Sequence, residues 1–320
     1  MDVIHPDRLP IIPEAILREH DVHQPLDTRF RAAARLLQSI WRARRGLAVG
    51  SYIRQDDQIT TLGSRLTDQD AAAGANFLDA TIAKLVRREV AYREPGAMVD
   101  EQRLWTNLLS SMPLAFNVFG PLKQDLRFAG AVCRKLWPDL IEDVIQIQFE
   151  HSPARGDLAF TGDGTSFDVF ITGRSPSGAK TFVAIEVKYS ESMNEGSAKP
   201  RPRYDDLAQT CGLYKDPVAA ELRAAPVQQL FREHMLAKTL VTSRLYDKGI
   251  FVCVAPRLNW QVQRACSIYA DHLTDADFTC PFQVVALENL IDALGGKGRQ
   301  RFVADLRERY TDFTPVHALF

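Results

Sequence analysis

Two apolar segments of the chain carry charged residues whose spacing could place them at one reaction site. Asp168 lies within the segment 167–171, and Glu186 and Lys188 are separated by a single residue within the segment 182–189. Both segments are rich in Phe, Val and Ile, which is typical of buried strands. An unpaired charge inside a protein is costly, so these side chains need partners. A divalent metal ion and a phosphate group would supply them.

Side-chain alternation along a strand predicts where these charges point. If the odd-numbered apolar residues of both segments join one core, the opposite face of the hairpin displays Asp168, Glu186 and Lys188 together. Glu150 falls on the polar face of the preceding predicted strand, 144–150. The apolar residues expected on the other sides of these three strands are Ile145, Ile147, Phe149, Phe167, Val169, Ile171, Val183, Ile185 and Val187.

This set of side chains suits metal-assisted hydrolysis of a phosphodiester. Mg²⁺ or Mn²⁺ prefers carboxylate oxygens and keeps several waters, so Asp168 and Glu186 would hold the ion, with the backbone carbonyl of Val187 as a third ligand. Such an ion lowers the pKa of a bound water and neutralises charge on the phosphate. Lys188 would orient or deprotonate the attacking water and stabilise the transition state. Glu150 would bind a second ion or hold a metal-bound water.

Two neighbouring residues are weaker candidates. His151, beside Glu150, could ligate a metal or act as a base, although a lone histidine at a strand end is more often a hydrogen-bonding or surface residue. Arg155 could contact a phosphate, although a solvated loop arginine is the commoner case. Taken alone, a Glu-x-Lys tripeptide in a strand is most often an exposed ion pair. The apolar flanks and the preceding Asp168 favour a functional site here.

The periodicity of apolar residues changes along the chain. Helical spacing predicts a mainly helical region up to about residue 140, and alternation from about residue 142 predicts strands. Strands that then alternate with helices indicate a mixed α/β sheet. The apolar segment 112–121, bracketed by prolines, and the polar segment 191–203 are predicted to be loops. Predicted helices cover 29–45, 68–94, 100–111, 123–137, 204–214, 226–240 and 259–272, and further strands cover 250–254 and 282–287.

Asp168 followed by the run Ile185-Glu186-Val187-Lys188 resembles the motif of the PD-(D/E)XK nuclease superfamily, which has the restriction-endonuclease-like fold. The predicted order of elements over residues 100–290 is similar to that fold: a helix, three strands that carry the acids, then a helix and a strand. Phe167 stands where the name of the superfamily implies proline, a position that is loosely kept. Members often place a glutamine on the helix after the motif, and Gln209 is the candidate for it.

The resemblance implies an α/β fold with a mixed central sheet flanked by helices. It also implies a nuclease-like domain over residues 100–320, with a helical N-terminal region, residues 1–99, packed on it. The implied activity is that of a Mg²⁺- or Mn²⁺-dependent nuclease, a hydrolase that acts on ester bonds. We expect DNA as the substrate, with RNA not excluded, and a role in restriction, defence or DNA repair.

The composition of the chain indicates its partners and its cellular location. The formal net charge of −1 gives no global attraction to a polyanion, so a nucleic-acid site must be a local patch. The five cysteines show no CxxC or CxxH spacing, which disfavours a structural zinc site. No apolar stretch approaches the roughly 20 residues of a membrane span, and residues 1–13 lack the apolar core of a signal peptide. We therefore expect a reducing, cytoplasmic setting with no membrane contact.

Two other functions are compatible with the sequence. The first is a nuclease-fold nucleic-acid-binding or scaffold module of a defence or mobile-element complex, which cleaves little or nothing alone. With either this function or that of a nuclease, the protein could form a homodimer or bind a protein partner. The apolar stretch 112–119 motivates the scaffold module, because exposed apolar surface can mark a partner site. The second is a sugar hydrolase with a pair of carboxylates. The adjacent Lys188 disfavours it, because two carboxylates suffice for that chemistry.

Overall fold

A mixed five-stranded sheet forms the centre of the protein, in a computed structural model that describes residues 9–53, 57–97, 99–194, 198–274 and 278–320. The strand order is β3-β4-β5-β6-β7; β3, β4 and β5 are antiparallel, whereas β5, β6 and β7 are parallel. The predicted mixed α/β sheet is therefore confirmed. The strands are β3 (Asp143–His151), β4 (Phe167–Arg174), β5 (Lys180–Val187), β6 (Lys248–Ala255) and β7 (Phe282–Ala286).

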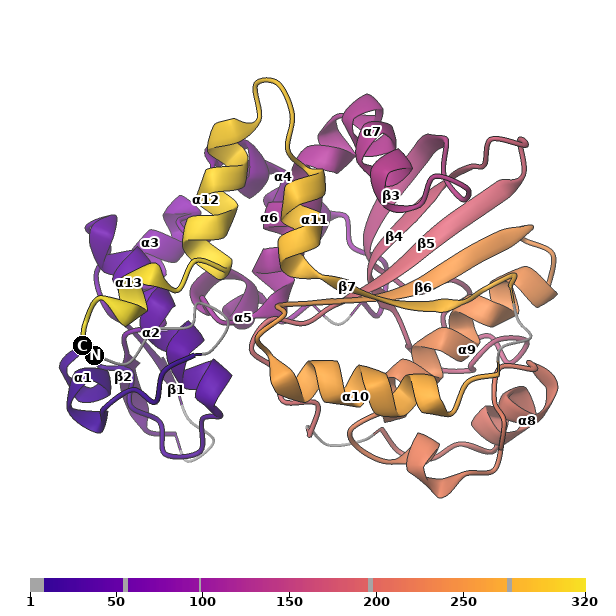
Figure 1. Cartoon of the computed structure of the whole chain (residues 1–320), viewed down its shortest axis with the longest axis horizontal. Helices are drawn as coiled ribbons and strands as arrows, with labels where there is room; N and C mark the ends of the chain where they lie inside the picture. The colour runs from indigo at the N-terminus through magenta and orange to yellow at the C-terminus, as the bar shows by residue number, and fades with distance from the viewer. Residues whose placement is uncertain (1–8, 54–56, 98, 195–197, 275–277) are drawn as a thin grey trace.

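Helices cover both faces of this sheet (Figure 1). Val169, Ile171, Val183 and Ile185 of the central hairpin join one apolar core, while Phe170 and its neighbours join a second core on the opposite face. Because both faces are covered, β4 and β5 are nearly continuous apolar runs. The helices on the first face are α6 (Ser111–Gln124), α7 (Leu126–Leu136) and α11 (Leu287–Ala293), and those on the second are α8 (Pro202–Thr210), α9 (Gln228–Thr242) and α10 (Trp260–Asp271).

The N-terminal hundred residues pack with the C-terminal helices. In Figure 1 the yellow helices α12 (Gln300–Tyr310) and α13 (Thr314–His317) lie against the indigo helix α2 (Arg29–Arg44). Phe30 and Leu37 of α2 join the first core. The division into residues 1–99 and 100–320 stays a prediction. The elements of these parts are α1 (Glu14–Glu19), α2 (Arg29–Arg44), β1 (Gly50–Ile53), β2 (Ile59–Leu62), α3 (Asp68–Ala73), α4 (Ala80–Ala91), α5 (Glu101–Thr106), α12 (Gln300–Tyr310) and α13 (Thr314–His317); η1 (Ala220–Arg223) precedes α9.

The predicted loop 112–121 is wrong, because this segment is helix α6. Its residues are buried on nearly all sides, so the helix lacks the one-sided apolar pattern by which helices are recognised. Pro113 is tolerated because it lies in the first turn, where backbone N–H groups have no partner within the helix. The preceding helix is shorter than predicted: α5 ends at Thr106, where Asn107 adopts an extended conformation.

The N-terminal region is also less uniformly helical than predicted. Strands β1 and β2 form a hairpin that helical spacing missed, because the strands are short and Ile53 and Ile59 are exposed. The helix predicted over 68–94 is two helices. Gly74, with φ +84°, ends α3, and Asp79 begins α4 by accepting hydrogen bonds from two backbone N–H groups of its first turn.

Regular alternation also fails at two positions near the motif. The register of β3 shifts between Val144 and Gln146, so Ile145 is 55% exposed rather than sharing the buried side of Ile147. Phe167 packs with the second core, not with Val169 on the first. Both irregularities depend on contacts between strands, which the sequence of a single strand does not reveal.

Two predictions concern segments that are only partly described. Residues 195–197 of the predicted loop 191–203 lie outside the described residues, and the described part is irregular up to Arg201. Residues 1–8 of the N-terminal segment also lie outside them. Among the helices that the structure describes, none combines the length and the apolar character needed to cross a membrane.

Candidate active site

The carboxyl end of β5 carries the acid–lysine motif, and its backbone is held from both sides. Ile185 pairs with Val169 of β4, and Val187 pairs with Val254 of β6. The N–H of Lys188 donates to the carbonyl of Val254 at 2.8 Å, which extends the ladder past the end of the strand. Ligands of open α/β sheets bind beyond the carboxyl ends of the strands, so the motif lies where a site is expected.

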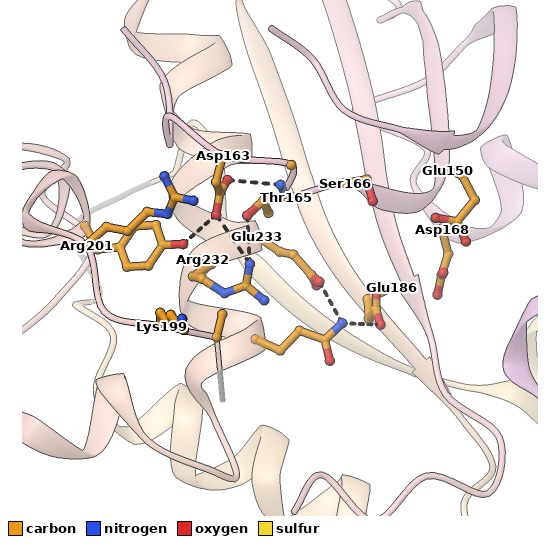
Figure 2. A pocket seen from close by; sticks show the side chains of 14 residues that line it. Glu150, Asp163, Thr165, Ser166, Asp168, Glu186, Lys199, Arg201, Arg232 and Glu233 are labelled. Atoms are coloured by element: carbon orange, nitrogen blue, oxygen red, sulfur yellow. Dashed lines mark hydrogen bonds and ion pairs between the residues drawn. The ribbon is translucent and has the colours of Figure 1, made fainter. Parts of the chain in front are cut away.

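Glu150, Asp168 and Glu186 line one cavity of about 500 Å³ (Figure 2). Three adjacent strands supply them: β3, β4 and β5. The antiparallel pairing of β4 with β3 and β5 brings the ends of these strands together. The structure thus brings together the three acids that alternation grouped, and their catalytic roles stay predictions.

The charges near the end of β5 are deeply buried. Glu186 is 4% exposed and Lys188 is 7% exposed. The side of the hairpin expected to be polar is filled further along by Phe170, Phe182 and Ala184, which pack under α8 and α9. The charged residues therefore form the polar end of an apolar layer, where desolvation strengthens every electrostatic interaction.

Lys188 takes part in a ring of hydrogen bonds with residues of α9. Its Nζ lies 2.7 Å from Glu186 Oε1 and donates to Gln229 Oε1 at 2.8 Å. Gln229 Nε2 donates to Glu186 Oε1 at 2.7 Å and to Glu233 Oε1 at 2.8 Å. One amide thus binds both members of the motif and an additional acid.

The sequence interpretation missed Gln229 and Glu233. It sought the glutamine at Gln209, which the structure places on the exposed side of α8 and which does not line the cavity. The sequence does indicate that these two residues act together: Gln229 and Glu233 are four residues apart on the helix predicted over 226–240, so they share one face. Spacing alone could not show that this face meets β5.

A backbone hydrogen bond fixes Asp168, and Glu150 has an unusual backbone conformation. The backbone N–H of Val187 donates to Asp168 Oδ2 at 2.7 Å, which ties the acid to the motif strand. Glu150 has φ +49°, a left-handed conformation that is uncommon for a residue other than glycine. Strained backbone of this kind persists only where the surrounding structure holds it in place, and it clusters at functional sites.

Burial and neighbouring carboxylates raise the pKa values of Asp168, Glu150 and Glu233. Burial, followed by the charges of Glu186 and Glu150, raises the pKa of Asp168 well above its usual value. Burial and then Glu186 raise the pKa of Glu150 to about 7, and the same two causes raise the pKa of Glu233. Grouped carboxylates of this kind disfavour their own ionised forms, and a cation between them would relieve the repulsion.

Lys188 responds in the opposite direction. Burial by itself lowers its pKa, but the charges of Glu186, Glu191, Glu233 and Asp168 outweigh burial and raise the pKa above its usual value. The side chain is therefore an ammonium ion at neutral pH. In this state it donates hydrogen bonds and supplies positive charge, but it cannot accept a proton.

The donor atoms fit a hard divalent cation that keeps most of its waters. Within the described part of the chain, no group of three or more His, Cys, Asp or Glu side chains is arranged to hold a metal ion by itself. The hydrogen bonds described above engage one oxygen each of Asp168 and Glu186. A cation such as Mg²⁺ is commonly held by one or two carboxylates together with waters and substrate phosphates. Two carboxylates that repel each other meet that requirement.

His151 and Arg155 lie outside the cavity. The Nδ1 atom of His151 is hydrogen-bonded to Glu94 Oε1, and Arg155 Nη2 lies 3.7 Å from the other oxygen of Glu94. Arg155 Nη1 also donates to the carbonyls of Gly96 and Gly164, at 2.9 and 3.2 Å. The contacts with Glu94 and Gly96 tie the loop after β3 to the segment after α4, and Arg155 Nη2 also donates to the carbonyl of Glu150 at 3.4 Å. Accessory roles of His151 and Arg155 stay predictions.

A mixed sheet flanked by helices, with acids from three neighbouring strands beside a buried lysine, defines a protein of the restriction-endonuclease-like fold. A family model described as the PD-(D/E)XK nuclease superfamily matches residues 25–312, so the chain belongs to this superfamily. The match includes most of the N-terminal region, which the motif alone did not cover. No curated protein and no solved structure gave a significant match.

Proposed function

We propose that the protein is a divalent-metal-dependent nuclease that hydrolyses phosphodiester bonds of DNA. Membership of the PD-(D/E)XK nuclease superfamily supports this. The observation that carries the proposal is the meeting of Glu150, Asp168 and Glu186 in one cavity, with Lys188 2.7 Å from Glu186. Four buried or half-buried charges in this arrangement have little structural justification, because apolar side chains would fill the same space at lower cost.

Asp168 and Glu186, with the carbonyl of Val187, would hold Mg²⁺ or Mn²⁺, which when bound lowers the pKa of a water and neutralises charge on the phosphate. The charged Lys188 would orient the attacking water and donate a hydrogen bond to the phosphoryl oxygen that gains charge. The raised pKa of Lys188 favours this role over that of a base. Glu150, with a pKa of about 7, is suited to exchange a proton with water at neutral pH or to hold a second ion.

A scaffold without catalysis is less well supported. The apolar stretch that motivated it, residues 112–119, is buried within α6 and offers no exposed apolar surface for a partner. A homodimer or a protein partner stays a prediction. The five cysteines are buried thiols, and a reducing, cytoplasmic setting is part of this proposal.

A cleavage assay tests the proposal directly. The purified chain would be incubated with Mg²⁺ or Mn²⁺ and with linear, supercoiled and single-stranded DNA, and with RNA as a comparison. We expect DNA to be cut, EDTA to stop the reaction, and the isosteric variant Glu186→Gln to be inactive. Glu288→Gln, a change at an acid on α11 that does not line the cavity, should keep full activity. Intact DNA of all three forms, or equal cleavage by Glu186→Gln, would refute the proposal.

A further inference from the structure

The cavity that contains the carboxylates also has a basic wall. Figure 2 shows Arg232, Arg201 and Lys199 gathered at the side of the cavity away from Glu150 and Asp168. Arg232 projects from α9, whereas Lys199 and Arg201 lie in the segment that leads into α8. The mechanism proposed above assigns no role to these three cations.

Arg232 is held in position by the protein. Its Nη1 donates to the hydroxyl of Thr165 at 2.8 Å and lies 3.6 Å from Asp163, and its Nε donates to Gln228 Oε1 at 3.2 Å. The side chain is only 16% exposed. A guanidinium that is already ordered loses little conformational freedom when it binds an anion.

Asp163 orients Arg232 without cancelling the charge of the whole wall. The hydroxyl of Tyr204 and the N–H of Thr165 both donate to the Asp163 carboxylate. Burial raises the pKa of Asp163, but these hydrogen bonds outweigh burial and hold the pKa below its usual value, so the group is ionised at neutral pH. One aspartate offsets one arginine, and Lys199 and Arg201 leave the wall with a positive balance.

A phosphate group is the ligand that fits this wall. The planar guanidinium of an arginine donates paired hydrogen bonds to phosphate oxygens. A lysine adds a compact positive charge on a flexible side chain that can adjust to the position of the phosphate. The hydroxyl of Ser166 lines the same cavity, between the basic wall and the acids. A volume of about 500 Å³ lies within the range of small-molecule sites, which leaves room for a nucleotide.

We propose that Arg232, assisted by Lys199 and Arg201, binds the phosphate next to the scissile one on the same nucleic-acid strand. The scissile phosphate then lies at the carboxylates, and the nucleoside between the two phosphates spans the cavity. This inference rests on the proposed nuclease function and adds how the substrate is held. The proposal implies that the substrate is a nucleic-acid strand with at least two consecutive phosphates.

Small nucleotides test the basic wall separately from cleavage. Thymidine 3′,5′-bisphosphate carries two phosphates, whereas the 3′- and 5′-monophosphates carry one, and none of the three contains a phosphodiester to cut. Their binding to the full chain in Mg²⁺ would be measured by isothermal titration calorimetry. We expect the bisphosphate to bind about tenfold tighter than either monophosphate. In Arg232→Gln this preference should shrink to less than about threefold, since the charged guanidinium is lost.

Two further variants complete the experiment. Arg264→Gln changes an exposed arginine on α10, outside the cavity, and should keep the tenfold preference. Lys199→Ala changes an exposed residue and should reduce the preference even if Arg232→Gln does not fold. An unchanged preference in Arg232→Gln, an equal loss for all three nucleotides, or no binding to the wild type would each overturn the proposal. An Arg232-dependent preference in a protein that cuts no DNA would instead refute only the nuclease function.

Discussion

Gln229 reaches from α9 to the Glu186 carboxylate and donates a hydrogen bond to it at 2.7 Å. The oxygen of the same amide accepts from Lys188 at 2.8 Å, and Lys188 lies 2.7 Å from Glu186. The three side chains form a closed ring in which one amide orients both an acid and an ammonium group of the same strand. Helix α9 is therefore part of the candidate site as well as a cover for the sheet.

The variant Gln229→Ala should weaken catalysis more than substrate binding. Without the amide, Lys188 and Glu186 lose a shared partner and sample more orientations. We expect kcat for DNA cleavage to fall about 10- to 100-fold, as is usual for residues that orient metal ligands. KM should change little. Gln209→Ala, on the exposed side of α8, is the matched control and should cleave at the wild-type rate. Equal losses in both variants would contradict the role of Gln229.

Asp168→Asn should stabilise the metal-free protein while it abolishes cleavage. The substitution removes one of the carboxylates that repel each other, but it keeps the oxygen that accepts the N–H of Val187. In EDTA we expect the melting temperature to rise by about 1–2 °C, which corresponds to roughly 1 kcal/mol given the unfolding entropy of a 320-residue chain. Mg²⁺ should raise the melting temperature of the wild type, because it binds the folded state, but not that of the variant. A variant that melts lower in EDTA and responds equally to Mg²⁺ would disprove the metal assignment.

Glu150 should give the metal-free protein a characteristic pH dependence. Burial and then the charge of Glu186 raise its pKa to about 7 in the folded state. In an unfolded chain a glutamate has its ordinary pKa of about 4.3. The folded state therefore binds a proton that the unfolded state has released. Its contribution to stability is complete below the unfolded value and is lost as the pH rises through about 7.

Urea unfolding in EDTA at pH 6 and pH 8 measures this effect. We expect the free energy of unfolding to be larger at pH 6, and the difference to shrink in Glu150→Gln. The raised pKa values of Asp168 and Glu233 act in the same direction and should leave a residual slope in the variant. A wild-type protein that is more stable at pH 8 would show that these acids are not grouped as described.

The acids and the lysine could be predicted from the sequence because short-range rules control their placement. Asp168, Glu186 and Lys188 lie near the ends of two strands joined by a short connection, so alternation and pairing are enough to bring them together. The same reasoning predicts the position of Glu150. The bulge at Ile145, however, makes the alternation of side chains along β3 less regular than its sequence indicates.

The helical half of the site could not be predicted in the same way. Gln229 and Arg232 lie on α9, and most residues of that helix are buried on several sides. Its apolar pattern therefore does not show which face meets the sheet. That orientation is decided by packing of α9 against β6 and α8, which depends on residues far apart in the sequence. The same reason explains why the sequence of α6, a helix buried on nearly all sides, predicts a loop.

Arg309 should be essential for joining the C-terminal helix to the N-terminal region. It is fully buried, donates to the backbone carbonyl of Asn76 at 2.6 Å and lies 4.3 Å above the ring of Trp41. In Arg309→Met the apolar stem remains and the cost of burying a charge disappears, but Asn76 Oδ1 loses its Arg309 donor. The carbonyl of Asn76 keeps only the hydrogen bond from Asn117 Nδ2 at 3.2 Å. The lost hydrogen bonds and the unsatisfied Asn76 Oδ1 outweigh that gain, so we expect the free energy of unfolding in urea to fall by about 2–3 kcal/mol. Arg301→Met, on the same helix but 95% exposed, should change stability by less than about 0.5 kcal/mol, and similar losses in both variants would mean that the buried contacts contribute nothing specific.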